Sequence, residues 1–319
     1  MTPGPKADLL VDCRNILGEA VQWNMALQRV FWTDIFGNAL WSCDENGGDI
    51  VCLDLPGSLC AFAFSQNGGM IAAFKDGLCD LDPSTGHRRL LATYQPELGS
   101  RTRMNDGGLD RQGRFLVGGI DEEGMHPITD VWSVSESGVQ PVLSGVGCAN
   151  SIAFSPEGDT MYFADSRRRD IFAYQYDRAT GTPGEKRRFA TLGEGEGSPD
   201  GSCVDSEGAL WNAQFGGGAV QRFLQTAERH IRVELGVPNV TCCCLGGRNL
   251  DLLFVTTASA GMDTAALKKW PWAGGLFVCQ VETKGLKPLI FPAFQDSEWQ
   301  PRSHAGQVAG KRERPVTPG

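Results

Sequence analysis

Four polar residues occupy matching places in a repeating pattern of the chain. Each lies four residues before an apolar residue that leads into a glycine-containing polar turn; they are Glu19, Asn105, Asn150 and Asp200. Carboxylate and amide oxygens are the donors that hard divalent cations such as Ca²⁺ and Mg²⁺ prefer. These oxygens make a cation site only if the fold brings the four positions together.

The repeat predicts a fold that does so. Its apolar anchors are separated by 41, 45, 45, 50 and 41 residues, at Trp23, Phe64, Leu109, Phe154, Val204 and Leu245. Several short strands in each period of forty-odd residues are typical of one β-propeller blade. The sequence therefore predicts an all-β, six-bladed β-propeller with a central channel. Equivalent positions of the blades surround one axis, so the four oxygens, with Cys60 and Thr241, are expected at the channel mouth.

Residues 198–211 illustrate the repeating unit. Apolar residues flank the turn Asp205-Ser206-Glu207-Gly208, a pattern that predicts strand, tight turn and strand. The repeats fill the chain without a linker, which indicates one propeller domain over residues 1–294. Residues 1 to about 14 are expected to add a closing strand to the last blade. Residues 295–319 lack apolar periodicity, and we expect a disordered tail there.

Charge and hydropathy narrow the class of function. The net charge of −9 and a sequence pI of about 5.0 disfavour a nucleic-acid partner, because phosphate binding needs a basic surface. No apolar run approaches the roughly 20 residues of a transmembrane helix. No secretory signal is recognisable at the start of the chain, so we expect a cytoplasmic protein without a membrane partner.

Cysteine and histidine chemistry is poorly supported. The sequence has eleven cysteines, an odd number, and none of them forms a CxxC pair. This pattern fits free thiols in a reducing compartment better than a disulfide framework. Strand alternation would send Cys243 to the face opposite Cys242 and Cys244, so we interpret this run as structural. The four histidines are isolated from candidate nucleophiles, which disfavours a Ser/His/Asp hydrolase.

Several segments together resemble the gluconolactonase family that includes regucalcin. The matching residues lie in five of the six repeats, in the family's order: Leu-Gly-Glu at 17–19, Arg-Met-Asn-Asp-Gly at 103–107, Asn150, Pro-Asp-Gly at 199–201 and Ala-Gly-Gly at 273–275. The family fold is a six-bladed propeller with one divalent metal in its channel. The chain departs from the family pattern at Leu116 and at Gly118-Gly119-Ile120, so its substrate pocket is expected to have a different floor.

The resemblance implies a role for each polar residue. Glu19, Asn150 and Asp200 would be the metal ligands, with Asp200 also the general base. The side chains that would contact substrate hydroxyls are Arg103, Asn105 and Glu123.

The donor set agrees with this role on chemical grounds. Two carboxylates and an amide without histidine or thiolate suit Ca²⁺, Mg²⁺ or Mn²⁺, and they admit Zn²⁺ or Fe²⁺ without selecting them. We therefore predict a metal-dependent hydrolase of sugar lactones, of the aldonolactone kind, in carbohydrate catabolism. The alternative is a calcium-binding or scaffold propeller without turnover. Only the enzyme requires a polar pocket beside the metal, which Arg103 and Asn105 would supply.

Overall fold

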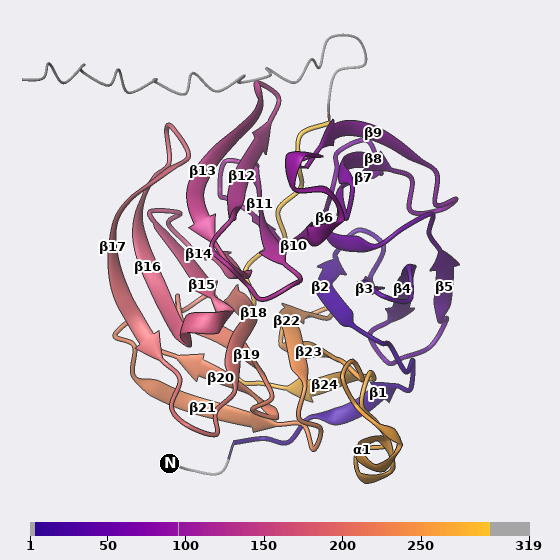
Figure 1. The fold of residues 1–319 in the computed structure, drawn as a ribbon. Coiled ribbons are helices and arrows are strands. Elements are labelled where there is room, and N and C mark those ends of the chain that lie inside the picture. The colour runs from indigo at the N-terminus through magenta and orange to yellow at the C-terminus, as the bar shows by residue number, and fades with distance from the viewer. Residues whose placement is uncertain (1–3, 95, 294–319) are drawn as a thin grey trace, which may run out of the picture.

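The computed structural model describes residues 4–94 and 96–293. These residues form six four-stranded antiparallel sheets arranged around a central axis, as Figure 1 shows. The predicted six-bladed β-propeller is therefore confirmed. The predicted tail, residues 295–319, lies outside the described residues, and the predicted boundary at residue 294 stays a prediction.

Each of the first five blades is built from four consecutive strands, the innermost first. Blade 1 contains β2 (Gly18–Asn24), β3 (Arg29–Asp34), β4 (Ala39–Asp44) and β5 (Val51–Asp54), and blade 2 contains β6 (Leu59–Phe64), β7 (Met70–Phe74), β8 (Gly77–Leu81) and β9 (Arg88–Thr93). Blade 3 contains β10 (Thr102–Leu109), β11 (Phe115–Asp121), β12 (Thr129–Ser135) and β13 (Gly138–Val146). Blade 4 contains β14 (Ala149–Phe154), β15 (Thr160–Asp165), β16 (Asp170–Asp177) and β17 (Thr182–Thr191), and blade 5 contains β18 (Ser198–Val204), β19 (Leu210–Phe215), β20 (Ala219–Phe223) and β21 (Arg229–Glu234).

Blade 6 joins the two ends of the described chain. It contains β22 (Val240–Gly246), β23 (Leu252–Thr257) and β24 (Leu276–Gln280), and its outer strand is the N-terminal β1 (Asp8–Val11). β1 pairs with β24 in antiparallel register, which confirms the predicted closing strand. The ring is thus closed by hydrogen bonds between the first strand and the last.

The turn at residues 205–208 shows why the predicted hairpins form. Asp205 Oδ1 accepts hydrogen bonds from the backbone N–H groups of Glu207 and Ala209, both at 3.0 Å. Gly208 has a φ of 79°, a left-handed conformation that glycine adopts at little cost. Asp205 also accepts from Trp211 Nε1 at 2.9 Å and from the buried Arg222 Nε at 2.8 Å. One carboxylate therefore shapes the turn and ties it to the neighbouring strands of blade 5.

The hydrophobic core is divided among the six interfaces between neighbouring blades. Each buried apolar cluster draws most of its residues from two adjacent sheets, as Trp23 and Phe254 illustrate between blades 1 and 6. Their rings stack with centroids 5.8 Å apart, an arrangement worth about 0.5–1.5 kcal/mol beyond area burial. The axis itself is therefore free to carry polar groups.

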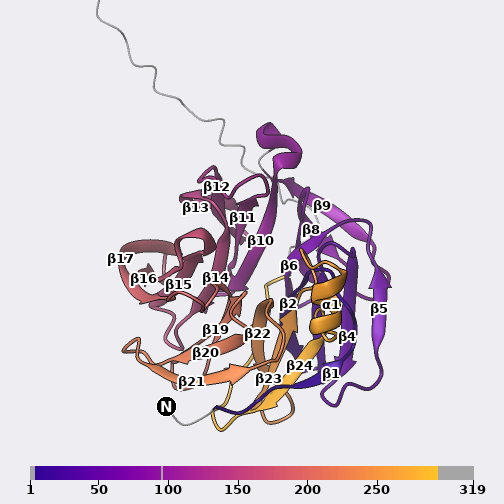
Figure 2. The same cartoon turned by 60° about the horizontal axis from the view of Figure 1, so that its bottom comes forward.

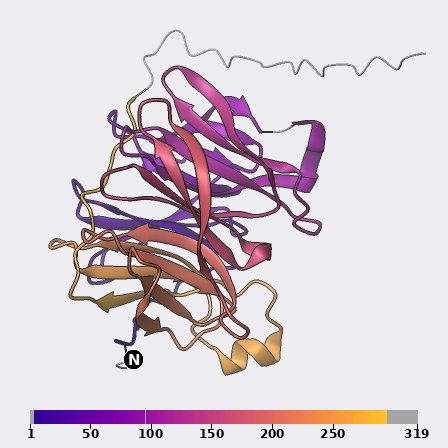
Figure 3. The same cartoon turned by 90° about the vertical axis from the view of Figure 1, so that its left-hand side faces the viewer.

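The two faces of the ring differ. All six innermost strands begin on one face, where residues 258–275 include the short helix α1 (Thr264–Lys269) beside blade 6 (Figure 2). That face also carries the 3-10 helices η1 (Pro96–Arg101) and η2 (Ser166–Arg168). Residues 281–293 run along the opposite face, as the yellow trace at the left of Figure 3 shows. The backbone of this segment bonds to Ser206 in blade 5 and to Phe64 and Gln66 in blade 2.

Helix content is small. Within residues 4–94 and 96–293, no helix combines the length and the apolar character needed to cross a membrane. The predicted cytoplasmic location stays a prediction.

Candidate active site

The predicted oxygen positions lie near the starting ends of the innermost strands. Glu19 is on β2, Asn105 on β10, Asn150 on β14 and Asp200 on β18. These strands contact one another around the axis in the order β2, β6, β10, β14, β18, β22 and back to β2. The fold therefore brings four side chains that are far apart in sequence to one end of the channel.

A β-bulge recurs at these positions. The strand register shifts between Glu19 and Gln22, between Asn150 and Ala153, and between Pro199 and Ser202, and β6, β10 and β22 shift at the corresponding places. A bulge adds one residue to one strand and re-aims the neighbouring side chains. Two of the bulge residues, Ala20 and Ser151, have positive φ angles of 51° and 58°. Strain of this kind is found where a backbone must present a side chain in a set direction.

The partly buried Glu19 and the buried Asp200 form an acidic group with Asp106, a partly buried residue that was not among the predicted site residues. Burial, reinforced by the charge of Asp106, raises the pKa of Glu19 to about 8. Burial also raises the pKa of Asp106 to about 7. The pKa of Asp200 lies well above its usual range because of burial and then the nearby charges of Glu19 and Asp106. Three carboxyl groups thus crowd into one desolvated space where they repel one another.

Asp106 also has a structural task. Its Oδ2 accepts a hydrogen bond from the backbone N–H of Ile152 at 2.9 Å, inside the bulge of β14. Strand alternation would have placed Asp106 on the side opposite Asn105, but the bulge in β10 breaks that alternation. The signal that could have revealed Asp106 is its place in the densest polar segment of the chain.

The positive charge of Arg103 lowers the pKa of both Glu19 and Asp200. The residue is only 4% exposed. Its Nε donates to Glu122 Oε1 at 3.1 Å, and its Nη1 donates to Met104 O at 2.9 Å and to Asn105 Oδ1 at 2.6 Å. Arg103 is therefore held in one orientation beside the site.

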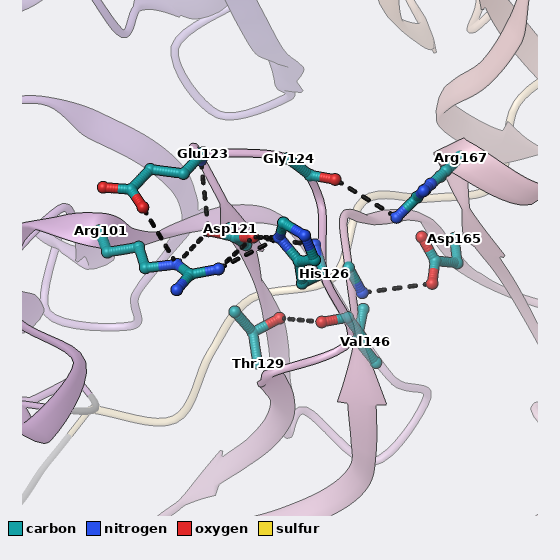
Figure 4. A network of polar contacts seen from close by, with 10 residues as sticks. Arg101, Asp121, Glu123, Gly124, His126, Thr129, Val146, Asp165 and Arg167 are labelled. Atoms are coloured by element: carbon teal, nitrogen blue, oxygen red, sulfur yellow. Dashed lines mark hydrogen bonds and ion pairs between the residues drawn. The ribbon is translucent and has the colours of Figure 1, made fainter.

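The carboxylate that pairs with Arg103 is Glu122, the neighbour of the predicted substrate contact Glu123, whose predicted role stays a prediction. The Glu122 carboxylate also pairs with Lys75 at 2.5 Å. Glu123 has a side chain that is 67% exposed and lies 3.5 Å from Arg101 (Figure 4). The structure thus brings together Glu19, Arg103, Asn105, Asn150 and Asp200, and places Glu123 apart from them.

The loop that carries Glu122 is fixed by Asp121, which is fully buried at the end of β11. Asp121 accepts from Arg101 Nε at 2.8 Å and from the backbone N–H of His126 at 2.8 Å, and it contacts His126 Nδ1 at 2.6 Å (Figure 4). These bonds, led by that of Arg101, hold the pKa of Asp121 below its usual range. The presentation of Glu122 therefore depends on a polar network just outside the channel.

Thiols do not compete for the same role. The eleven cysteines all lie within the described part of the chain, and none forms a disulfide. Burial raises the pKa of Cys148, next to Asn105 and Asn150, to about 12, and it holds Cys242, Cys243 and Cys244 well above the usual thiol range. Since a thiolate is the form that binds metal, protonated thiols suit a structural role.

The sequence comparison identifies the family. Residues 17–259 match the family described as "SMP-30/Gluconolactonase/LRE-like region". The chain belongs to this family. The resemblance predicted from the five motif segments is therefore confirmed.

Individual relatives agree with this assignment. The chain is 36% identical over 295 residues to an L-arabinolactonase of Azospirillum brasilense, covering 91% of this chain and 96% of that one. It is 30% identical over 288 residues to human regucalcin, covering 88% and 95%. The structure of a calcium-binding regucalcin from Agrobacterium tumefaciens superposes with a TM-score of 0.85 at 28% identity, covering 91% and 98%. The lactonases in this family support the predicted hydrolase class.

Proposed function

We propose that the protein hydrolyses a sugar lactone to the corresponding aldonic acid, with one divalent cation held by Glu19, Asn150 and Asp200. The observation that carries the proposal is the group of buried and partly buried carboxyl side chains at the channel mouth of a lactonase-family propeller. Burial and the mutual repulsion of the carboxyl groups raise their pKa values more than the nearby Arg103 lowers them. A cation in this place would relieve the repulsion.

The donors fit a hard cation. Glu19 and Asp200 offer carboxylate oxygens and Asn150 offers an amide oxygen, the ligand types of Ca²⁺, Mg²⁺ and Mn²⁺. Among the described residues, no three His, Cys, Asp or Glu side chains are grouped as a metal site by themselves. The proposed site therefore depends on the Asn150 amide as its third donor. The calcium-binding regucalcin relative supports this choice of metal class.

The residues of the chain divide the reaction among them. When bound, a divalent cation would supply Lewis acidity, which polarises a lactone carbonyl and makes water more acidic. Asp200 accepts the proton of the attacking water as a general base. Asn105 and Arg103, which both lie on β10 of blade 3, orient the sugar hydroxyls. The bond from the carbonyl carbon to the ring oxygen then breaks, and Asp200 returns the proton to this oxygen, which becomes a hydroxyl of the open-chain acid.

A second candidate is a calcium-binding propeller without turnover, because the same acidic site would serve either role. The two are separated by measuring acid release from a panel of aldonolactones after chelation, followed by addition of single divalent metals. The enzyme is expected to lose activity on chelation and to regain it with one or more metals. Metal binding without acid release from any lactone would favour the calcium-binding role. Hydrolysis that is unaffected by chelation would overturn the metal-dependent mechanism.

A further inference from the structure

Hydrogen bonds run in one direction through the candidate site, across blades 3, 4 and 5. Arg103 Nη1 donates to Asn105 Oδ1 at 2.6 Å, and Asn105 Nδ2 donates to Asn150 Oδ1 at 3.3 Å. Asn150 Nδ2 donates to Ser166 Oγ at 2.7 Å, and Ser166 Oγ donates to the backbone carbonyl of Pro199 at 2.7 Å. The last acceptor directly precedes Asp200 on β18.

The first donor and the last acceptor determine the direction of this series of hydrogen bonds. A guanidinium can only donate and a carbonyl oxygen can only accept. Ser166 has one hydroxyl hydrogen, which is directed to Pro199 O, so Ser166 Oγ must accept from Asn150. The Asn150 amide must therefore present its nitrogen to Ser166. From the other end, Arg103 fixes Asn105 with its nitrogen toward Asn150 in the same way.

Reversing the Asn150 amide would break its hydrogen bonds with both Asn105 and Ser166. Its nitrogen would face the donor nitrogen of Asn105, and its oxygen would face the lone pairs of Ser166. A buried polar group left without a partner is unfavourable, so this reversal is disfavoured. Asn150 is 4% exposed and Ser166 is 7% exposed, so water has little access to replace either bond. The amide oxygen is thus held on the side of Asn105, away from Ser166.

We propose that Ser166 is a positioning residue for the metal site, which holds the Asn150 amide with its oxygen available to the cation. Ser166 also links Asn150 of blade 4 to the strand that carries Asp200 in blade 5. Its location suits this task, because Ser166 begins η2, which packs against β18. The inference rests on the proposed function, since it gives Asn150 the role of metal ligand. It also explains the amide at position 150: an aspartate there would have no hydrogen to give to Ser166.

The test is the affinity of the full-length protein for Ca²⁺ and Mn²⁺, measured by titration calorimetry after a chelator has removed bound metal. Ser166→Ala removes the acceptor of Asn150 Nδ2, and the loss of such an outer partner typically weakens metal binding about 10–100-fold. Ser166→Thr keeps the hydroxyl and is expected to restore affinity close to that of the wild type. The matched control is Ser155→Ala, at the other end of blade 4, where the hydroxyl bonds to Asp159 at 2.9 Å. This variant should keep wild-type affinity.

Each outcome decides a separate point. If the wild type binds neither Ca²⁺ nor Mn²⁺, the proposed metal site itself is overturned. Normal wild-type binding with equal affinity in Ser166→Ala would overturn only the positioning role, as would equal losses in Ser166→Ala and Ser155→Ala. If Ser166→Ala does not fold, Ser166→Cys provides a similarly sized side chain with a weak acceptor. It is then expected to weaken binding, and wild-type affinity in that variant would overturn the inference.

Discussion

Removing the charge of Glu122 tests whether Glu122, which the structure places beside Arg103, or Glu123, which the family resemblance suggests, acts at the site. The two residues are adjacent and identical in type, so each serves as a control for the other. Glu122 pairs at 3.1 Å with Arg103, and the two side chains are 26% and 5% exposed. Glu123 pairs at 3.5 Å with Arg101, with exposures of 67% and 37%. Replacement of either residue by glutamine keeps the shape and removes only the charge.

The expected loss follows from these exposures. Glu122→Gln leaves the buried Arg103 without its carboxylate, so the guanidinium is drawn toward the channel carboxyl groups and away from Asn105. A hydrogen bond to a charged group is worth about 1.5–3 kcal/mol, which corresponds to roughly a 10–100-fold fall in kcat/KM. Exposed ion pairs are worth about 0–1 kcal/mol, so Glu123→Gln should lower kcat/KM by less than about fivefold.

The assay is the initial rate of acid release from the best lactone of the panel, measured over a range of substrate concentrations. Thermal unfolding of both variants shows whether the protein remains folded at the assay temperature. Equal losses in the two variants, or a larger loss in Glu123→Gln, would refute the assignment of Glu122 to the site. A loss in Glu122→Gln that merely follows the unfolded fraction would refute it as well.

Four other outcomes are expected. Asp200→Ala should abolish metal binding in calorimetry and acid release in the lactone assay, whereas retained metal-dependent turnover would contradict its role. Asp121 has a lowered pKa in the folded state, so its stabilising contribution is complete above the unfolded pKa of about 3.9 and declines as pH falls below it. In Asp121→Asn the free energy of unfolding should accordingly fall less steeply as the pH is lowered into the acid range, which denaturant titrations at several pH values would measure. Cys52, an exposed thiol, should react first with a thiol reagent at pH 8, and Cys52→Ser should remove that fast phase. Deletion of residues 295–319 should leave the melting temperature and activity nearly unchanged.

The fold could be predicted because its signal is repetitive. Anchors such as Trp23 and Phe154 recur with a period that only a few architectures produce, and an error in one blade does not hide the other five. The same spacing located Glu19, Asn150 and Asp200 at equivalent bulges.

Local details of the site could not be predicted in the same way. Asp106 joins Glu19 and Asp200 because a bulge breaks the two-residue alternation that strand reasoning assumes. Glu122 rather than Glu123 meets Arg103 because the loop after β11 is directed by Asp121, whose partners lie at other points of the chain. Backbone direction in such a loop is a property of tertiary contacts and leaves no periodic trace in the sequence.

The bulge in every innermost strand has a consequence for how this scaffold could change its chemistry. Blades 2 and 6 carry Cys60 and Thr241 where blades 1 and 5 carry carboxylates, yet all four strands shift register near these positions. One place of the repeat thus carries side chains that differ in size and charge, although Cys60 and Thr241 are buried and Thr241 Oγ1 donates to the Gly18 carbonyl of blade 1. The six equivalent positions together determine which side chains surround the channel mouth. Substitutions at Cys60 and Thr241 are therefore where an altered substrate preference would be sought first.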